Sequence, residues 1–171
     1  MHKNQRLGMA YFIDKYVSIL HKDRISVIDV GSKDINGNDR STFPGPKYSY
    51  TGCDIVSGPN VDIVLDSPDN CQDIGQFDVV ITSSTIEHTR DVYKFVRNLA
   101  SLVKPGGLVY VHCPFAFGCH GYPVDCWRIM PDGMRFLLDD IAKLDVIDTL
   151  MWRSSCKAKD LDVMGIARKP K

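Results

Sequence analysis

The chain has 171 residues, of which 44% are hydrophobic and 25% are charged, as in an ordinary globular protein with one core. Its 21 basic and 21 acidic residues cancel, so no net charge attracts a nucleic acid, and no apolar run approaches the roughly 20 residues that span a bilayer. The N-terminal segment lacks the apolar core of a signal peptide, which favours a cytoplasmic protein. We therefore expect a single domain over residues 1–171, with neither a nucleic acid nor a membrane partner.

The six cysteines include no C-x-x-C pair, which is typical of free thiols in a reducing compartment. Cysteines and histidines are crowded in the second half of the chain, at His112, Cys113, Cys119, His120 and Cys126. Their spacing matches no structural zinc pattern, so we expect no metal site.

Apolar residues at helical spacing predict an amphipathic helix over residues 5–21, within an N-terminal helical segment 1–22. A second helix is expected over Asp91–Val103, ended by a tight turn at Lys104–Gly107. A third is expected over Pro131–Ile141, with proline at its first position. The segment Ser41–Lys47 contains two prolines and a glycine and is expected to be a loop.

Short apolar runs predict seven strands. The runs are Ser26–Val30, Tyr48–Ile55, Val61–Leu65, Phe77–Thr82, Leu108–Cys113, Val146–Met151 and Asp162–Ala167. Because strands alternate with helices, we expect a mostly parallel sheet that is covered on both faces. The last two strands are joined only by the short polar segment 152–160. They should therefore form an antiparallel hairpin, since a parallel crossover needs about a dozen residues.

The first strand leads into the segment Val27–Gly37, VIDVGSKDING, where an apolar run ends in Asp29 and a turn follows at Gly31. Gly31 can adopt a positive φ and lets a ligand approach the backbone closely. Asp29 can accept hydrogen bonds from turn amides or from a cationic ligand amine. This arrangement is typical of a pocket for a phosphate or a nucleoside, although a plain structural turn has the same pattern.

Asp54 lies at the end of the next strand, 23 residues beyond Gly31, where a carboxylate can bind both hydroxyls of a ribose. The alternative is an aspartate that caps a helix or holds a turn. With the glycine turn upstream, we favour the ribose site.

Three segments in this order resemble the class I S-adenosylmethionine-dependent methyltransferases. They are the glycine-turn segment, FDVVITSSTIEH at Phe77–His88 and LVKPGGLVYVHCP at Leu102–Pro114. The resemblance implies a Rossmann-like three-layer α/β sandwich, a mostly parallel seven-stranded sheet with an antiparallel last strand, and S-adenosyl-L-methionine as the cofactor. One departure is Lys33, which stands where the common D-x-G-x-G-x-G motif has its second glycine.

The resemblance also implies that cofactor contacts lie at the strand ends. Asp66 and Ser67 follow the third strand, where the family usually contacts the adenine amino group, with Asp62 and Asp69 as neighbouring candidates. Backbone at residues 82–84 would line the methionine part of the cofactor. The expected cofactor-binding residues are Asp29, Gly31, Ser32, Asp34, Asp54, Ile55, Asp66, Ser67 and Ser83.

A Glu-His pair before a helix, here Glu87 and His88, is common in one branch of the family and would lie at the mouth of the cleft. Glu87 could instead begin the following helix, where a carboxylate interacts favourably with the helix dipole.

The segment His120–Arg128 resembles an H-x-x-P-x-D-x-W-R stretch that follows the fifth strand in some small methyltransferases. We therefore expect residues 114–130 to form the substrate-side loop, since loops at this edge of a parallel sheet bind ligands. The alternative is a self-packed loop, with Asp125 paired to Arg128 and Trp127 in the core.

Methyl transfer to an oxygen requires removal of its proton, for which histidine has the best matched pKa. We expect His88 or His120 to act as this base, helped by Asp125. The expected substrate contacts are Glu87, Trp127 and Arg128.

The chain lacks the Asn-Pro-Pro-aromatic signature of amino-methylating nucleic-acid enzymes and the Pro-Cys nucleophile of cytosine C5 enzymes. We therefore expect a small-molecule acceptor, such as a sugar or another hydroxylated metabolite. One alternative is a protein that binds S-adenosylmethionine without catalysis, which Lys33 in the glycine turn allows. Another is an NAD-dependent oxidoreductase, although the G-x-G-x-x-G motif and a Tyr-x-x-x-Lys pair are missing.

Overall fold

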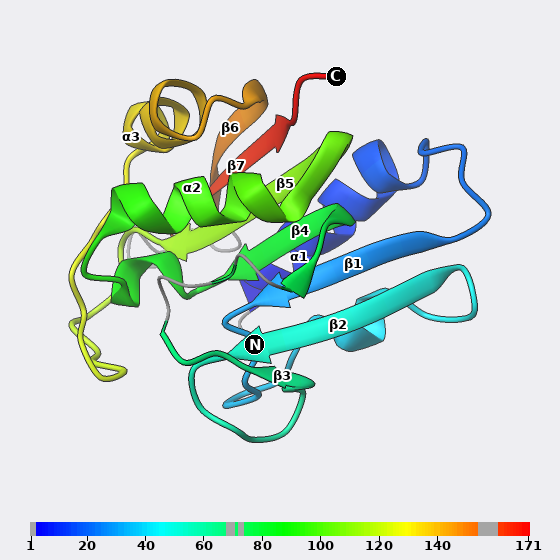
Figure 1. The fold of residues 1–171 in the computed structure, drawn as a ribbon. Coiled ribbons are helices and arrows are strands. Elements are labelled where there is room, and N and C mark those ends of the chain that lie inside the picture. Colours follow the sequence, from blue (N-terminus) through cyan, green and yellow to red (C-terminus); the bar gives the residue numbers. More distant parts are fainter. Residues whose placement is uncertain (1–2, 68–70, 72–73, 154–160) are drawn as a thin grey trace.

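A computed structural model describes residues 3–67, 71, 74–153 and 161–171 (Figure 1). Within these residues, seven strands form one sheet in the order β3-β2-β1-β4-β5-β7-β6. They are β1 (Ile25–Val30), β2 (Tyr48–Asp54), β3 (Ile63–Val64), β4 (Phe77–Ser83), β5 (Val103–Pro114), β6 (Asp145–Arg153) and β7 (Leu161–Arg168). Neighbouring strands are parallel except at β7, which is antiparallel to both β5 and β6. The expected fold class is therefore confirmed.

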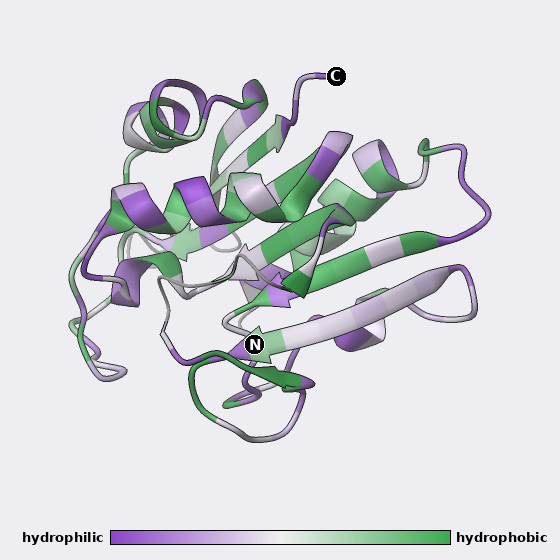
Figure 2. Ribbon diagram, in the orientation of Figure 1, coloured by the Kyte–Doolittle hydropathy of each residue, from purple (hydrophilic) through white to green (hydrophobic). Residues whose placement is uncertain are grey.

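Helices cover both faces of the sheet and enclose two apolar clusters. In Figure 1, α1 (Lys3–Phe12) lies behind the sheet, whereas α2 (Val92–Leu102) lies in front of it. Along β1, Val27 belongs to the cluster on the α1 face, and its neighbour Ile28 belongs to the cluster beneath α2. Because alternate residues of a strand point to opposite faces, a strand covered on both sides is mostly apolar, as the largely green β4 and β5 of Figure 2 show.

The N-terminal helix is shorter than its periodicity predicts. α1 ends at Phe12 and is followed by one wider helical turn, Ile13–Val17, so the helix does not reach residue 21. The Ser18 hydroxyl donates a hydrogen bond to the Asp14 carbonyl at this point, a contact that commonly bends or ends a helix. Ile19, which the apolar pattern would bury, is consequently 56% exposed.

α2 begins after Asp91, whose side chain accepts a hydrogen bond from the Lys94 N–H at 2.9 Å, and it ends at Leu102, one residue before the predicted end at Val103. The segment Lys104–Gly107, predicted as a tight turn, belongs to β5 but bulges there. Between two pairings β5 advances from Val103 to Leu108 while β4 advances only from Phe77 to Val79, and Gly106 has a φ of +76°. Lys169, beyond the end of β7, exchanges backbone hydrogen bonds with Gly106 and Gly107 and ties this bulge to the sheet.

β3 has only two residues, where a strand over residues 61–65 was expected. The Asp62 carboxylate accepts a hydrogen bond from the Gly52 N–H at 2.7 Å, and the Asp62 N–H donates to the Gly52 carbonyl at 2.8 Å. Because these bonds use the Gly52 N–H and carbonyl groups, regular pairing of β2 with β3 begins only after them. It is limited to Ile63 and Val64.

The C-terminal half agrees closely with the predicted elements. α3 (Pro131–Phe136) continues into a wider helical turn, Leu137–Ile141, and β6 and β7 form the expected antiparallel hairpin. Most of the connection between these strands, residues 154–160, lies outside the described residues. None of the helices in the described ranges has the length and apolar character that crossing a membrane would require.

Candidate functional site

A cavity of about 920 Å³ lies at the carboxyl ends of β1, β2, β4 and β5, the edge at which such sheets bind ligands. Its volume is in the range of small-molecule sites. The predicted site residues in its wall are Asp29, Gly31, Ser32, Asp54, Ile55, Ser83, His88 and His120. Those outside this wall are Asp34, Asp66, Ser67, Glu87, Asp125, Trp127 and Arg128.

Gly31 has the positive φ that the sequence predicts, at +82°. The N–H groups of Gly31 and Ser32 both donate to the Cys53 carbonyl, at 2.8 and 3.0 Å, and tie the end of β1 to β2. A Cβ at Gly31 would lie 2.7 Å from the Thr85 Cβ and closer still to the rest of that side chain. The group that approaches the Gly31 backbone closely is thus the Thr85 side chain, where the sequence suggested a ligand.

Asp29 is buried in the cavity wall and accepts a hydrogen bond from the Tyr50 hydroxyl, so its partner is a side chain and not the turn amides that the sequence suggested. Burial, with a further contribution from the charge of Asp39, raises the pKa of Asp29 to about 8. A protonated Asp29 is therefore a substantial form near neutral pH.

Asp54 has one carboxylate oxygen 3.0 Å from the Lys33 N–H and the other 3.1 Å from the Val56 N–H. These contacts are those of a turn aspartate, and Asp54 is also one of the residues that line the cavity. Asp34 holds a tighter local turn, since it accepts from the Gly37 N–H at 2.6 Å, and it does not reach the cavity. Asp34 was expected to bind the cofactor, but these contacts are those of a residue that holds a turn.

The segment after β3 contributes Leu65 to the cavity wall. Asp66 is exposed, and neither Asp66 nor Ser67 belongs to the wall formed by the described residues. Asp69, the neighbouring candidate, lies outside the described residues.

A buried polar group that sequence reasoning missed lines the opposite side of the cavity. His112 is 2% exposed, and its Nε2 atom lies 3.2 Å from Asp162 Oδ2 on β7. Its Nδ1 atom has no hydrogen-bond partner in the described part of the chain. The sequence held one sign of this site, a polar histidine near the end of the apolar strand 108–113. Its partner Asp162 could not be found in this way, because only the pairing of β5 with β7 brings Asp162 beside His112.

Glu87 is fully buried in the short helical turn Ile86–His88, so the prediction that it lies at the cleft mouth is wrong. It does not begin the following helix either, because α2 starts at Val92. Neither carboxylate oxygen has a hydrogen-bond partner among the described residues. Burial raises the pKa of Glu87 to about 8.

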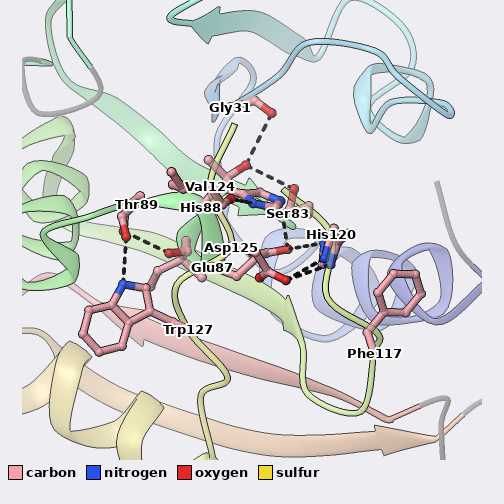
Figure 3. Close-up of polar contacts among 12 residues, drawn as sticks. Gly31, Ser83, Glu87, His88, Thr89, Phe117, His120, Val124, Asp125 and Trp127 are labelled. Carbon is pink, nitrogen blue, oxygen red and sulfur yellow. Dashed lines mark hydrogen bonds and ion pairs between the residues drawn. The ribbon is translucent and has the colours of Figure 1, made fainter. Parts of the chain in front are cut away.

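His88 and His120 converge on this carboxylate (Figure 3). Their Nε2 atoms lie 3.7 and 3.9 Å from Glu87 Oε1, and their rings meet edge to face at 5.0 Å. The opposite nitrogens contact backbone carbonyls: His88 Nδ1 is 2.6 Å from the oxygen of Val124, and His120 Nδ1 is 3.0 Å from that of Gly118. The structure therefore brings the two candidate bases together in the cavity wall.

The alternative prediction of a self-packed substrate-side loop is confirmed for the pair of Asp125 and Arg128. Arg128 donates two hydrogen bonds to the Asp125 carboxylate, at 2.6 and 2.7 Å, and these bonds hold the pKa of Asp125 below its usual range. Asp125 also accepts from the backbone N–H of His120 at 2.7 Å, so it positions the segment that carries this histidine. Trp127 is not in the core: it is 38% exposed and donates to the Thr89 carbonyl at 2.8 Å.

Comparison with known proteins identifies the family to which the chain belongs. The family described as "Methyltransferase domain" matches residues 1–135. A stretch of 37 residues is 51% identical to the ubiquinone biosynthesis O-methyltransferase of Caulobacter vibrioides and covers 22% of this chain and 15% of that enzyme. A 57-residue stretch is 38% identical to the enzyme of the same name from Rhizobium leguminosarum bv. trifolii, covering 33% and 23%. The chain thus matches less than a quarter of the length of either relative.

Solved structures agree on the fold. The Burkholderia thailandensis 1,6-didemethyltoxoflavin-N1-methyltransferase, solved with 1,6-didemethyltoxoflavin and S-adenosylhomocysteine, superposes with a TM-score of 0.75 over 99% of this chain and 79% of that one, at 16% identity. The N-methyltransferase NodS of Bradyrhizobium japonicum, solved with S-adenosylhomocysteine, gives 0.68 over 99% and 89%, at 10% identity. The chain therefore belongs to the methyltransferase domain family, with the fold of the class I S-adenosylmethionine-dependent enzymes.

Proposed function

We propose that this protein transfers a methyl group from S-adenosylmethionine to a small molecule, with a hydroxyl group of a sugar or another hydroxylated metabolite as the acceptor. The observation that carries this proposal is the cavity wall, which joins a turn aspartate at one end to two histidines at the other. Family membership supports the reaction, and the neutral net charge supports a small acceptor over a nucleic acid. A cytoplasmic location stays a prediction from the sequence.

The residues present fit the cofactor. Asp54 faces the cavity with a carboxylate that can accept hydrogen bonds from ribose hydroxyls, as in other nucleotide-binding α/β folds. Beside it, Ile55 and Val56 are 41% and 47% exposed in the same wall and offer apolar surface to a planar base. Ser83 and Gly31 belong to the same wall, and we assign them to the methionine part of the cofactor. When bound, the cofactor supplies an electrophilic methyl group on a positively charged sulfur.

The acceptor end of the cavity is formed by His88 and His120. Each imidazole has its Nδ1 atom against a carbonyl oxygen, which can only accept, so the proton of the neutral ring is on Nδ1 and the lone pair is on Nε2. A nitrogen in this state can take the proton of a hydroxyl group while the wall orients the acceptor. Asp125 supports this arrangement by holding the backbone of His120.

Calorimetric titration with S-adenosylhomocysteine tests the cofactor assignment. We expect micromolar binding to the wild-type protein and affinity reduced about tenfold or more in Asp54→Asn, because charge-assisted hydrogen bonds to the ribose are lost. The matched control is Asp23→Asn, an exposed aspartate that precedes β1 and lies outside the wall, which should bind like wild type. Binding of NADH in place of S-adenosylhomocysteine would move the assignment to an oxidoreductase.

Turnover of hydroxylated acceptors tests the catalytic residues. We expect both His88→Ala and His120→Ala to lose turnover while retaining S-adenosylhomocysteine binding. Wild-type turnover in both variants would show that neither histidine activates the acceptor. Tight cofactor binding without turnover of any acceptor would instead favour a binding protein without catalysis.

A further inference from the structure

We propose that Glu87, His88 and His120 form a binding site for one divalent transition-metal cation, with Zn²⁺ as the best-matched ion. The sequence predicted no metal site, because the histidines and cysteines around residues 112–126 have no zinc-like spacing. The structure instead combines one of those histidines with two residues from the end of β4.

The three ligand atoms are close enough for one ion. One carboxylate oxygen and one nitrogen of each imidazole all lie within 4.8 Å of one another. Glu87 Oε1 is 3.7 Å from His88 Nε2 and 3.9 Å from His120 Nε2. Zinc bonds of about 2.0–2.2 Å at tetrahedral angles separate ligand atoms by roughly 3.4 Å. The two distances from Glu87 Oε1 therefore need to shorten by only a few tenths of an ångström, and no two of the three ligand atoms are more than 4.8 Å apart.

Both imidazoles are already oriented as metal ligands. Metal-binding histidines usually donate the second ring N–H to a carbonyl or carboxylate, which fixes the lone pair on the other nitrogen. Here His88 Nδ1 contacts the Val124 carbonyl and His120 Nδ1 contacts the Gly118 carbonyl. As Figure 3 shows, the two rings then present Nε2 toward Glu87.

The carboxylate of Glu87 lacks any compensating interaction from hydrogen bonds. It is fully buried, and neither oxygen has a hydrogen-bond partner in the described part of the chain. Burying a carboxylate in this way is costly unless it is neutralised, paired or bound to a metal. A cation would compensate this charge without any change in the fold.

The ligand types select the ion. Two imidazoles and one carboxylate suit Zn²⁺ or Co²⁺, whereas Mg²⁺ prefers oxygen ligands and retains water. His88 and His120 are part of the cavity wall, so an ion held by their Nε2 atoms would lie beside the cavity, where an open fourth coordination position could take a ligand from it. Insofar as the proposed function holds, that position suits an acceptor hydroxyl. With the ion bound, both Nε2 atoms are ligands, and the ion takes over activation of the hydroxyl by lowering its pKa.

Titration of the chelator-stripped full chain with ZnCl₂ by calorimetry tests the site. We expect one equivalent to bind, with affinity reduced at least about tenfold in Glu87→Gln, His88→Ala and His120→Ala. His21→Ala, which removes an exposed histidine elsewhere, and Cys119→Ser, which removes the thiol beside His120, should retain binding. MgCl₂ should bind far more weakly than ZnCl₂.

Thermal unfolding keeps the test independent of a folding defect. Glu87→Gln preserves the shape of the side chain, so it should fold in the presence of chelator and lose only the zinc-dependent rise in Tm that the wild type shows. Absence of stoichiometric zinc binding in the wild type, or full binding in Glu87→Gln, would overturn the site. S-adenosylhomocysteine binding in the same samples separates the two proposals, since either can fail while the other stands.

Discussion

Gly31→Ala should destabilise the protein because of two separate effects at the turn after β1. First, φ at Gly31 is +82°, a left-handed conformation that costs a non-glycine residue about 1–2 kcal/mol. Second, the new Cβ would lie 2.7 Å from the Thr85 Cβ and nearer to its other atoms, and forcing a methyl group into a packed site typically costs about 1–3 kcal/mol. The expected total is therefore about 2–5 kcal/mol.

Gly45→Ala provides a matched control for this prediction. Its φ is +81°, almost the same as at Gly31, but a Cβ there would have no atom within 4 Å. It should cost only the conformational term of about 1–2 kcal/mol. The difference between the two variants thus isolates the clash with Thr85.

Equilibrium urea unfolding of the wild type and both variants measures these terms, with the slope of the transition checked for constancy. We expect Gly31→Ala to lose at least about 1 kcal/mol more than Gly45→Ala. Equal losses would refute the packing argument. A loss below about 0.5 kcal/mol for Gly31→Ala would refute the conformational argument as well.

Two buried aspartates give opposite pH dependences. The pKa of Asp29 is about 8 when folded but about 4 when unfolded, so the folded state retains a proton and stability falls as pH rises between these values. In Asp29→Asn the amide oxygen can still accept a hydrogen bond from Tyr50, but the side chain no longer titrates. The free energy of unfolding in urea should therefore rise for this variant relative to wild type as the pH increases from 5 to 8. A difference in unfolding free energy that stays constant over this range would contradict the prediction. At Asp78, burial acts to raise the pKa, but hydrogen bonds from Lys22 and Ser26 outweigh it and hold the pKa below its usual range. The stabilisation that the ionised Asp78 carboxylate provides is present above about pH 4 and is lost as the pH falls through the folded pKa. Asp78→Asn should therefore lower the free energy of unfolding by about 1–2 kcal/mol at pH 7 and by less at pH 3. An equal cost at both pH values would show that the charge of Asp78 contributes nothing.

Some of the candidate site could be predicted from local patterns, and some could not. Asp54 was found because the end of the second strand must lie at the ligand-binding edge of a parallel sheet. His112 was missed as a site residue because its partner, Asp162, is 50 residues away and is brought close only by antiparallel pairing. Trp127 was assigned to the substrate or to the core, yet it caps the Thr89 carbonyl near the surface.

The sequence by itself determined the elements and their order. Apolar runs without alternation require burial on both faces, a positive φ such as that of Gly31 favours glycine, and a short connection allows only an antiparallel hairpin. All of these are local constraints. Only the tertiary structure decided how the site is assembled. His88 contacts Val124, 36 residues away, because the substrate-side loop folds back over the end of β4, and this contact brings His120 to Glu87. No periodicity records such a contact, since it depends on how the loop packs and not on the pattern of either segment.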